Sequence, residues 1–153
     1  MRLRILPAAA VLLAGLLTGC GSKPESVDSL QLRSVVFPSG KTMQVELAMR
    51  RSEVLRGLKF REPMGPDRGL LMILGNKPTN FSVSMYEVKM PLDLIWMDGR
   101  RSIVQLLRDA PPCAGPEASC KYYGGGYPAL YILEAPAGTI ARNNLKAGMT
   151  LEF

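Results

Sequence analysis

The sequence contains no histidine, the side chain most often used for acid–base catalysis and metal binding near neutral pH. A Ser-His-Asp or Cys-His catalytic arrangement therefore cannot form, and imidazole metal sites are excluded. The nine methionines could in principle bind copper(I) through their thioether sulfurs. Met85 and Met97, however, alternate with their neighbours as strand residues do, so we interpret them as core side chains. We expect no metal and no cofactor.

Cysteine is nearly as scarce, with three residues in the chain. Cys113 and Cys120 lie seven residues apart and flank a loop rich in proline and glycine. In an oxidising compartment such a pair most simply forms a disulfide. Their spacing is not Cys-x-x-Cys, so a structural bond is favoured over a redox-active one.

The sequence has no apolar run long enough to span a bilayer, since residues 5–17 fall short of the roughly 20 residues required. Arg2 and Arg4 precede this run, which is the pattern of a signal peptide. The four residues that follow, ending at Cys20, resemble the lipobox of bacterial lipoproteins, in which the cysteine carries the lipid. We predict a lipoprotein signal peptide at 1–19 and a lipidated Cys20 with a flexible tether at 20–29.

The predicted signal peptide and lipid site indicate a protein of the bacterial cell envelope that faces the periplasm and is anchored to the membrane through the Cys20 lipid. By the sorting rule of enteric-type bacteria, an aspartate after the lipidated cysteine retains a lipoprotein in the inner membrane. Position 21 is glycine, which favours the outer membrane over the inner. The formal charge is +6, and removal of Arg2 and Arg4 leaves 17 basic against 13 acidic residues, or +4. The basic residues are scattered, which argues against a nucleic-acid partner.

From residue 30 onward the apolar positions mostly alternate, and residues 30–153 are long enough for one globular domain. The segments expected to form strands are 42–49, 69–74, 81–86, 92–97, 102–107, 131–134 and 149–153. Asp98-Gly99 predicts a tight hairpin turn, because such a turn needs positive φ values that this dipeptide adopts readily. Ser52 is expected to cap a short helix that ends near Gly57, and a second short helix is expected within 139–145. The sequence thus predicts a mainly β fold: a single-domain β-sandwich or jelly-roll-like barrel with one or two short helices.

Two groups of side chains are candidates for chemistry or binding. Glu87, Asp93 and Glu134 lie nearest apolar stretches, and two facing carboxylates could hydrolyse a saccharide. Tyr122, Tyr123 and Tyr127 flank three glycines and could present a surface on which sugars or peptides stack. The alternative for the acids is a solvated or paired carboxylate, and for the tyrosines a loop lying over the core.

Several ordered blocks resemble the domain of unknown function 192 family over about residues 32–153. They are Gly57-Leu58-Lys59-Phe60-Arg61, Gly69-Leu70-Leu71-Met72, residues 90–98 from Met-Pro-Leu-Asp to Trp-Met-Asp, and residues 131–138 through Gly148. The resemblance implies a compact, mainly β exported domain with no established activity. Where the family usually shows Trp-Met-Lys-Asn-Thr, this chain has Ser84-Met85-Tyr86-Glu87-Val88.

If that block forms a binding surface in relatives, this chain has lost it or rebuilt it with Tyr86, Glu87 and Lys89. Arg61 and Asp93 match the family pattern and are further candidates for a polar site, although such a pair could equally pin a loop. We expect an accessory module that binds an envelope saccharide, peptide or protein partner. The alternatives are a carboxylate-dependent hydrolase acting on cell-wall saccharide and a purely structural or assembly lipoprotein, and an enzyme is the less favoured reading.

Overall fold

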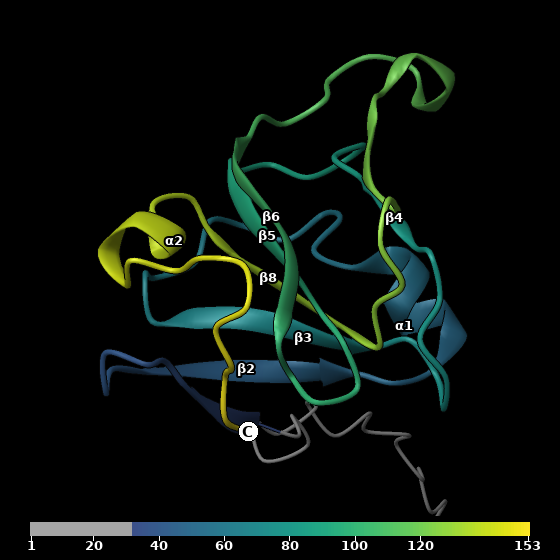
Figure 1. Ribbon diagram of the computed structural model, residues 1–153. Helices are drawn as coiled ribbons and strands as arrows, with labels where there is room; N and C mark the ends of the chain where they lie inside the picture. Colours follow the sequence, from purple (N-terminus) through teal and green to yellow (C-terminus); the bar gives the residue numbers. More distant parts are fainter. Residues whose placement is uncertain (1–31) are drawn as a thin grey trace, which may run out of the picture.

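The computed structural model describes residues 32–153, which form one mainly β domain with short helices (Figure 1). The expected fold class is confirmed. The predicted signal peptide at 1–19, the predicted lipid site at Cys20 and the predicted tether at 20–29 lie outside the described residues. No helix of the described part is long and apolar enough to cross a membrane.

Six strands form the main sheet, in the spatial order β1-β2-β3-β8-β5-β6. In chain order they are β1 (Leu32–Val36), β2 (Thr42–Ala48), β3 (Arg68–Ile73), β5 (Leu92–Met97), β6 (Ile103–Ala110) and β8 (Tyr131–Pro136). Neighbouring strands are antiparallel except β2 and β3, which run parallel. The remaining elements are helix α1 (Arg51–Arg56), β4 (Ser82–Ser84), the 3-10 turn η2 (Glu117–Ser119), β7 (Tyr122–Gly124) and helix α2 (Thr139–Arg142).

The two edges of the main sheet are bridged by the end of the chain. Glu152 pairs with Val36 of β1, and Thr150 pairs with Ser102 at the start of β6. The segment 149–153 therefore alternates as the sequence predicts, but it makes isolated bridges instead of a continuous strand. Its contacts close one end of the sheet, which gives the domain its barrel-like form and leaves less strand edge open to other chains.

Both faces of the sheet are covered, which explains why all six residues of β5 are buried. One face packs within the barrel-like fold around Ile95 and Leu133, under helix α2. The other face, which carries Trp96 and Met72, packs against α1 and the β4–β7 pair. Figure 1 shows α1 and β4 to the right of the sheet and α2 to its left.

The β4–β7 pair is held to the sheet by Trp96. Its indole nitrogen donates a hydrogen bond to the Phe81 carbonyl at 2.9 Å. Gly124, at the end of β7, lies directly against the indole ring with a φ of +81°. A methyl group at position 124 would lie 2.2 Å from a ring carbon of Trp96, so this contact requires glycine.

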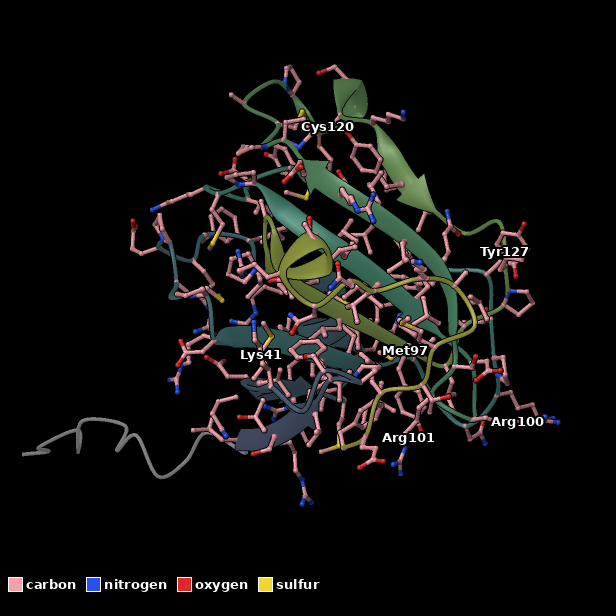
Figure 2. The ribbon with its side chains drawn as sticks, turned by 60° about the vertical axis from the view of Figure 1, so that its left-hand side comes forward. Lys41, Met97, Arg100, Arg101, Cys120 and Tyr127 are labelled. Atoms are coloured by element: carbon pink, nitrogen blue, oxygen red, sulfur yellow. A yellow bond between two sulfur atoms is a disulfide. The ribbon has the colours of Figure 1, made fainter. Side chains whose placement is uncertain are left out.

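The hairpin between β5 and β6 is present, but its turn differs from the predicted one. The loop has three residues, since the amide of Asp98 donates to the carbonyl of Ser102. The Asp98 carboxylate accepts hydrogen bonds from the amides of Arg100 and Ser102, and the left-handed residue is Arg101 with a φ of 64°. The aspartate side chain thus organises a wider loop of the type that contains a bulge. Figure 2 shows Arg100 and Arg101 projecting from its tip.

Helix α1 ends at Gly57 as predicted, but Ser52 does not cap it. The helix begins at Arg51, with Arg50 as its N-cap residue, and Glu53 binds the two backbone amides that precede the helix. The Glu53 carboxylate accepts hydrogen bonds from the amides of Met49 and Arg50. The hydrogen bond from the Arg50 side chain, followed by the two amide hydrogen bonds, lowers the pKa of Glu53 to about 2, so this acid stabilises the helix start in its charged form.

Candidate functional site

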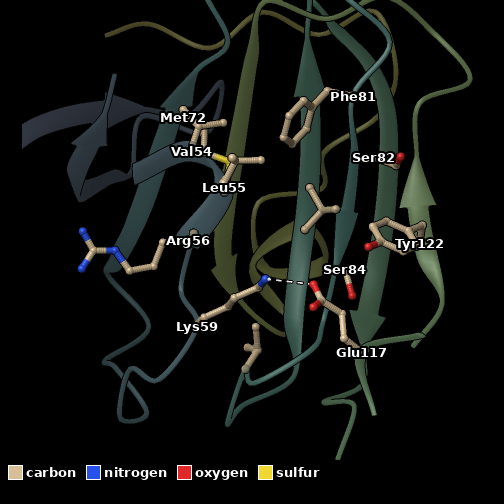
Figure 3. A pocket seen from close by; sticks show the side chains of 13 residues that line it. Val54, Leu55, Arg56, Lys59, Met72, Phe81, Ser82, Ser84, Glu117 and Tyr122 are labelled. Carbon is tan, nitrogen blue, oxygen red and sulfur yellow. Dashed lines mark ion pairs between the residues drawn. The ribbon is translucent and has the colours of Figure 1, made fainter. Parts of the chain in front are cut away.

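A pocket of about 270 Å³ lies between helix α1 and the β4–β7 pair (Figure 3). One end is apolar and is formed by Val54, Leu55, Met72 and Phe81. The other end is charged and carries Lys59, Ser84 and Glu117, while Arg56, Ser82 and Tyr122 complete the polar lining. Such a combination of an apolar floor with a few polar groups is typical of sites for small ligands.

Lys59 and Glu117 face each other across the charged end of this pocket (Figure 3). Their closest nitrogen–oxygen distance is 3.7 Å, longer than a hydrogen-bonded ion pair, and the Glu117 side chain is 55% exposed. An exposed pair of this length contributes little to stability. A ligand that offered Lys59 a better anion could therefore displace Glu117 at small cost.

Glu117 is presented to the pocket by the disulfide loop. Cys113 and Cys120 are bonded, as the sequence predicts, with their Cα atoms 5.8 Å apart. The loop is fixed to the β4 end because the Cys113 amide donates a hydrogen bond to the carbonyl of Met85. The disulfide thus does more than close a loop, since it places the pocket's carboxylate opposite Lys59.

Glu134 is buried directly beneath helix α1. Its Oε2 accepts a hydrogen bond from the amide of Leu58 at 3.0 Å. Burial raises the pKa of Glu134 to about 7, although the Leu58 hydrogen bond and the charge of Lys59 act in the opposite direction. The carboxyl oxygens also lie about 3 Å from where a side chain at Gly57 would begin, so glycine allows the close approach of helix and sheet.

Asp93 is fully buried and has a structural role. Its Oδ1 accepts a hydrogen bond from the amide of Asp109, and its Oδ2 accepts one from the amide of Ile140 at the start of α2. It is opposite Ala135 in the sheet, whereas the adjacent residue Leu94 is opposite Glu134. Asp93 and Glu134 therefore project from opposite faces of the sheet and cannot act together on one substrate.

The other residues selected from the sequence are dispersed. Arg61 forms two hydrogen bonds with Glu46 of β2 and is not paired with Asp93. Lys89 forms an ion pair with Glu62. Both partners were missed because they lie 15 and 27 residues away in the sequence.

Tyr86 and Glu87 lie near the pocket. The Lys59 ammonium is 5.5 Å from the centre of the Tyr86 ring. Glu87 is exposed, and its carboxylate raises the pKa of Tyr86 through a hydrogen bond and its charge. The backbone of Glu87 has a φ of 59°, and its carbonyl accepts a hydrogen bond from the amide of Phe60. Tyr86 and Glu87 thus support the loop that carries Lys59.

The three tyrosines do not form one stacking surface. Tyr122 lines the pocket, whereas Tyr123 packs against the core with the Lys121 ammonium 5.1 Å from its ring centre. Tyr127 is exposed and does not line the pocket, and Figure 2 shows it projecting outward. Strand alternation separates Tyr122 from Tyr123, and the glycine loop carries Tyr127 away from both.

The pocket contains residues that the sequence gave little reason to select. Lys59, the β4 residues Ser82 and Ser84, and Glu117 come from three separate segments and meet only in the fold. One signal was available, because the block that departs from the family pattern spans residues 84–88. Ser84 and Val88 from this block line the pocket.

Solved structures share this architecture. A protein from Novosphingobium aromaticivorans DSM 12444, described as of unknown function, matches with a TM-score of 0.72 and 28% identity over 83% of this chain and 89% of that one. A protein from Sinorhizobium meliloti 1021, described as a "putative transcription regulator", matches with a TM-score of 0.67 and 29% identity over 78% of this chain and 89% of that one. No curated protein matches the chain significantly.

The family comparison covers nearly all of the described domain. The DUF192 model, described as "Uncharacterized ACR", matches residues 34–153. Its range agrees with the blocks noted in the sequence and with the domain seen in the structure. The chain therefore belongs to the domain of unknown function 192 family, DUF192.

Proposed function

We propose that this protein is a lipid-anchored binding module of the bacterial cell envelope, and that its pocket holds a small amphipathic ligand with an anionic group. The leader and the lipobox-like residues before Cys20 support the address and the anchor. The outer membrane is favoured by Gly21. The description of the Sinorhizobium relative as a transcription regulator does not suit this chain, because an exported protein would not meet DNA.

The two unlike ends of the pocket indicate the class of ligand that it would bind. The apolar end suits a short hydrocarbon or apolar side chain, and burying it there would be favourable by about 0.8 kcal/mol for each methylene. The charged end offers Lys59 together with the hydroxyl group of Ser84. The Ser84 oxygen accepts a hydrogen bond from the amide of Tyr86, which leaves its own proton free to donate to an anion.

Glu117 is an anion of the protein itself that a ligand could replace. Its weak pairing with Lys59 means that a ligand carboxylate or phosphate would take over the ammonium, and Glu117 would move into solvent. A ligand from a peptide carboxyl terminus or an acidic saccharide fragment would meet the same requirement. The hydrolase alternative gains no support from Asp93 and Glu134, which are on opposite faces.

The head-group preference of the pocket can be measured with three probes of equal chain length: hexanoate, hexanol and hexylammonium. We expect hexanoate to raise the melting temperature and hexylammonium to have no effect, because a ligand stabilises the state it binds. In Lys59→Met the advantage of hexanoate over hexanol should disappear. Glu117→Gln should bind hexanoate more tightly, since Lys59 loses its competitor.

Lys41→Met is the matched control, since Lys41 lies in the exposed turn between β1 and β2, away from the pocket (Figure 2). It should keep the preference of the parent protein. Equal responses to the three probes, or the same preference in Lys59→Met as in the parent, would contradict the proposed ligand class.

A further inference from the structure

The exposed apolar side chains of the domain are unevenly distributed. Of the six large ones, Leu55 and Tyr122 line the pocket, Phe60 follows the pocket residue Lys59, and Met49 precedes helix α1. Leu55, Phe60, Met49 and Tyr122 are each more than half exposed. These four side chains thus line the pocket or lie within a few residues of its lining in the sequence, and apolar side chains exposed around one site indicate a contact surface.

Two arginines of helix α1 lie among these residues. Arg51 and Leu55 are four residues apart and therefore share one face of the helix, and Arg56 lines the pocket together with Leu55. Both arginines are exposed, and neither forms an ion pair with a carboxylate among residues 32–153. By contrast, Arg50 and Lys59 already have the partners Glu53 and Glu117.

We infer that this α1 face, consisting of Met49, Arg51, Leu55, Arg56, Phe60 and Tyr122, docks on an anionic bilayer surface. Charge complementarity selects this partner, because unpaired guanidinium groups beside exposed apolar side chains match lipid phosphates above an acyl layer. Each cation near an anionic surface contributes about 1 kcal/mol of attraction. The apolar side chains would enter the boundary between headgroups and acyl chains.

The tether would allow this orientation. From Cys20 to Leu32 there are twelve steps along the chain, which span about 40 Å at most. A domain of this size has a radius of gyration of about 14 Å, so any of its faces could reach the bilayer. Docking through α1 would bring the pocket mouth to the membrane surface, where an amphipathic ligand is concentrated.

The inference is tested on the chain without residues 1–19 and with Cys20→Ser, so that no lipid anchor contributes. In sedimentation with vesicles at low salt, we expect binding to mixed phosphatidylglycerol and phosphatidylcholine and little binding to phosphatidylcholine alone. Arg51→Gln with Arg56→Gln should weaken the binding about tenfold or more, in line with about 1 kcal/mol for each lost cation. Adding Leu55→Ser should weaken it further.

The matched control is Arg33→Gln with Arg100→Gln, which removes two exposed cations from β1 and from the β5–β6 loop, outside the α1 face. The vesicle binding of this control should fall by less than about threefold. Circular dichroism should show that both double variants are folded. Equal losses in the two double variants would mean nonspecific attraction and would overturn the inference. Absence of binding to the anionic vesicles would also overturn it and would assign the face to a protein partner.

Discussion

Replacing Gly124 with alanine is expected to lower the free energy of unfolding by about 3 kcal/mol or more, the largest effect of any single methyl group added to this domain. The added methyl would lie 2.2 Å from the Trp96 ring, so either the indole or strand β7 must shift. The left-handed backbone at this position, with a φ of +81°, adds about 1 to 2 kcal/mol for a residue with a side chain. Urea unfolding followed by Trp96 fluorescence measures both the stability and the displacement of the ring.

Gly40→Ala separates these two contributions. Gly40 has a similar φ of +79°, but a methyl group there meets no atom within 4 Å. Its free energy of unfolding should fall only by the cost of the left-handed backbone, about 1 to 2 kcal/mol. If the two variants were equally stable, the packing of Gly124 against Trp96 would not be what holds β7 to the sheet.

The stability of the domain is expected to fall as the pH rises from about 4.5 to 7, because of Glu134. Burial raises its folded-state pKa from the ordinary 4.5 to about 7, so the folded protein keeps a proton that the unfolded chain releases in this interval. The shift corresponds to about 3 kcal/mol, fully present below pH 4.5 and lost by the time the pH exceeds 7. Because the chain has no histidine, no imidazole titrates in this pH interval and adds its own pH dependence to the stability.

Glu134→Gln should remove this slope, since the amide does not ionise and its oxygen can still accept the Leu58 hydrogen bond. Chemical unfolding at several pH values between 4.5 and 8 gives the slope directly. Glu152→Gln, at an exposed acid near the chain end, should keep the slope of the parent protein. A flat profile in the parent would show that Glu134 is more solvated or better paired than its burial indicates.

Much of the fold follows from alternation in the sequence. The strand positions of Met43 and Val45, and the hairpin around Asp98, are set by local patterns that survive in the structure. The details that failed depend on side-chain hydrogen bonds. Asp98 widens its own turn, and Glu53 replaces Ser52 in capping α1. A propensity for turns or caps does not say which of several polar side chains will take the free amides.

The site was less predictable than the fold because its parts come from distant segments. Asp93 was a candidate for catalysis or binding, but its partners in the structure are two backbone amides that the sequence does not reveal. Lys59 gains its importance from Glu117, which is 58 residues further along the chain and is positioned by the disulfide loop. Contacts at that separation require the tertiary structure.

The most direct test of a ligand-binding pocket between α1 and the β4–β7 pair is to locate a bound probe by nuclear magnetic resonance. Titrating hexanoate into ¹⁵N-labelled protein should shift the amide signals of Lys59, Ser82, Ser84 and Val88, and these shifts should be lost in Lys59→Met. Shifts that gather instead around Tyr127 or the β5–β6 loop, or an unchanged spectrum at high hexanoate concentration, would contradict the account.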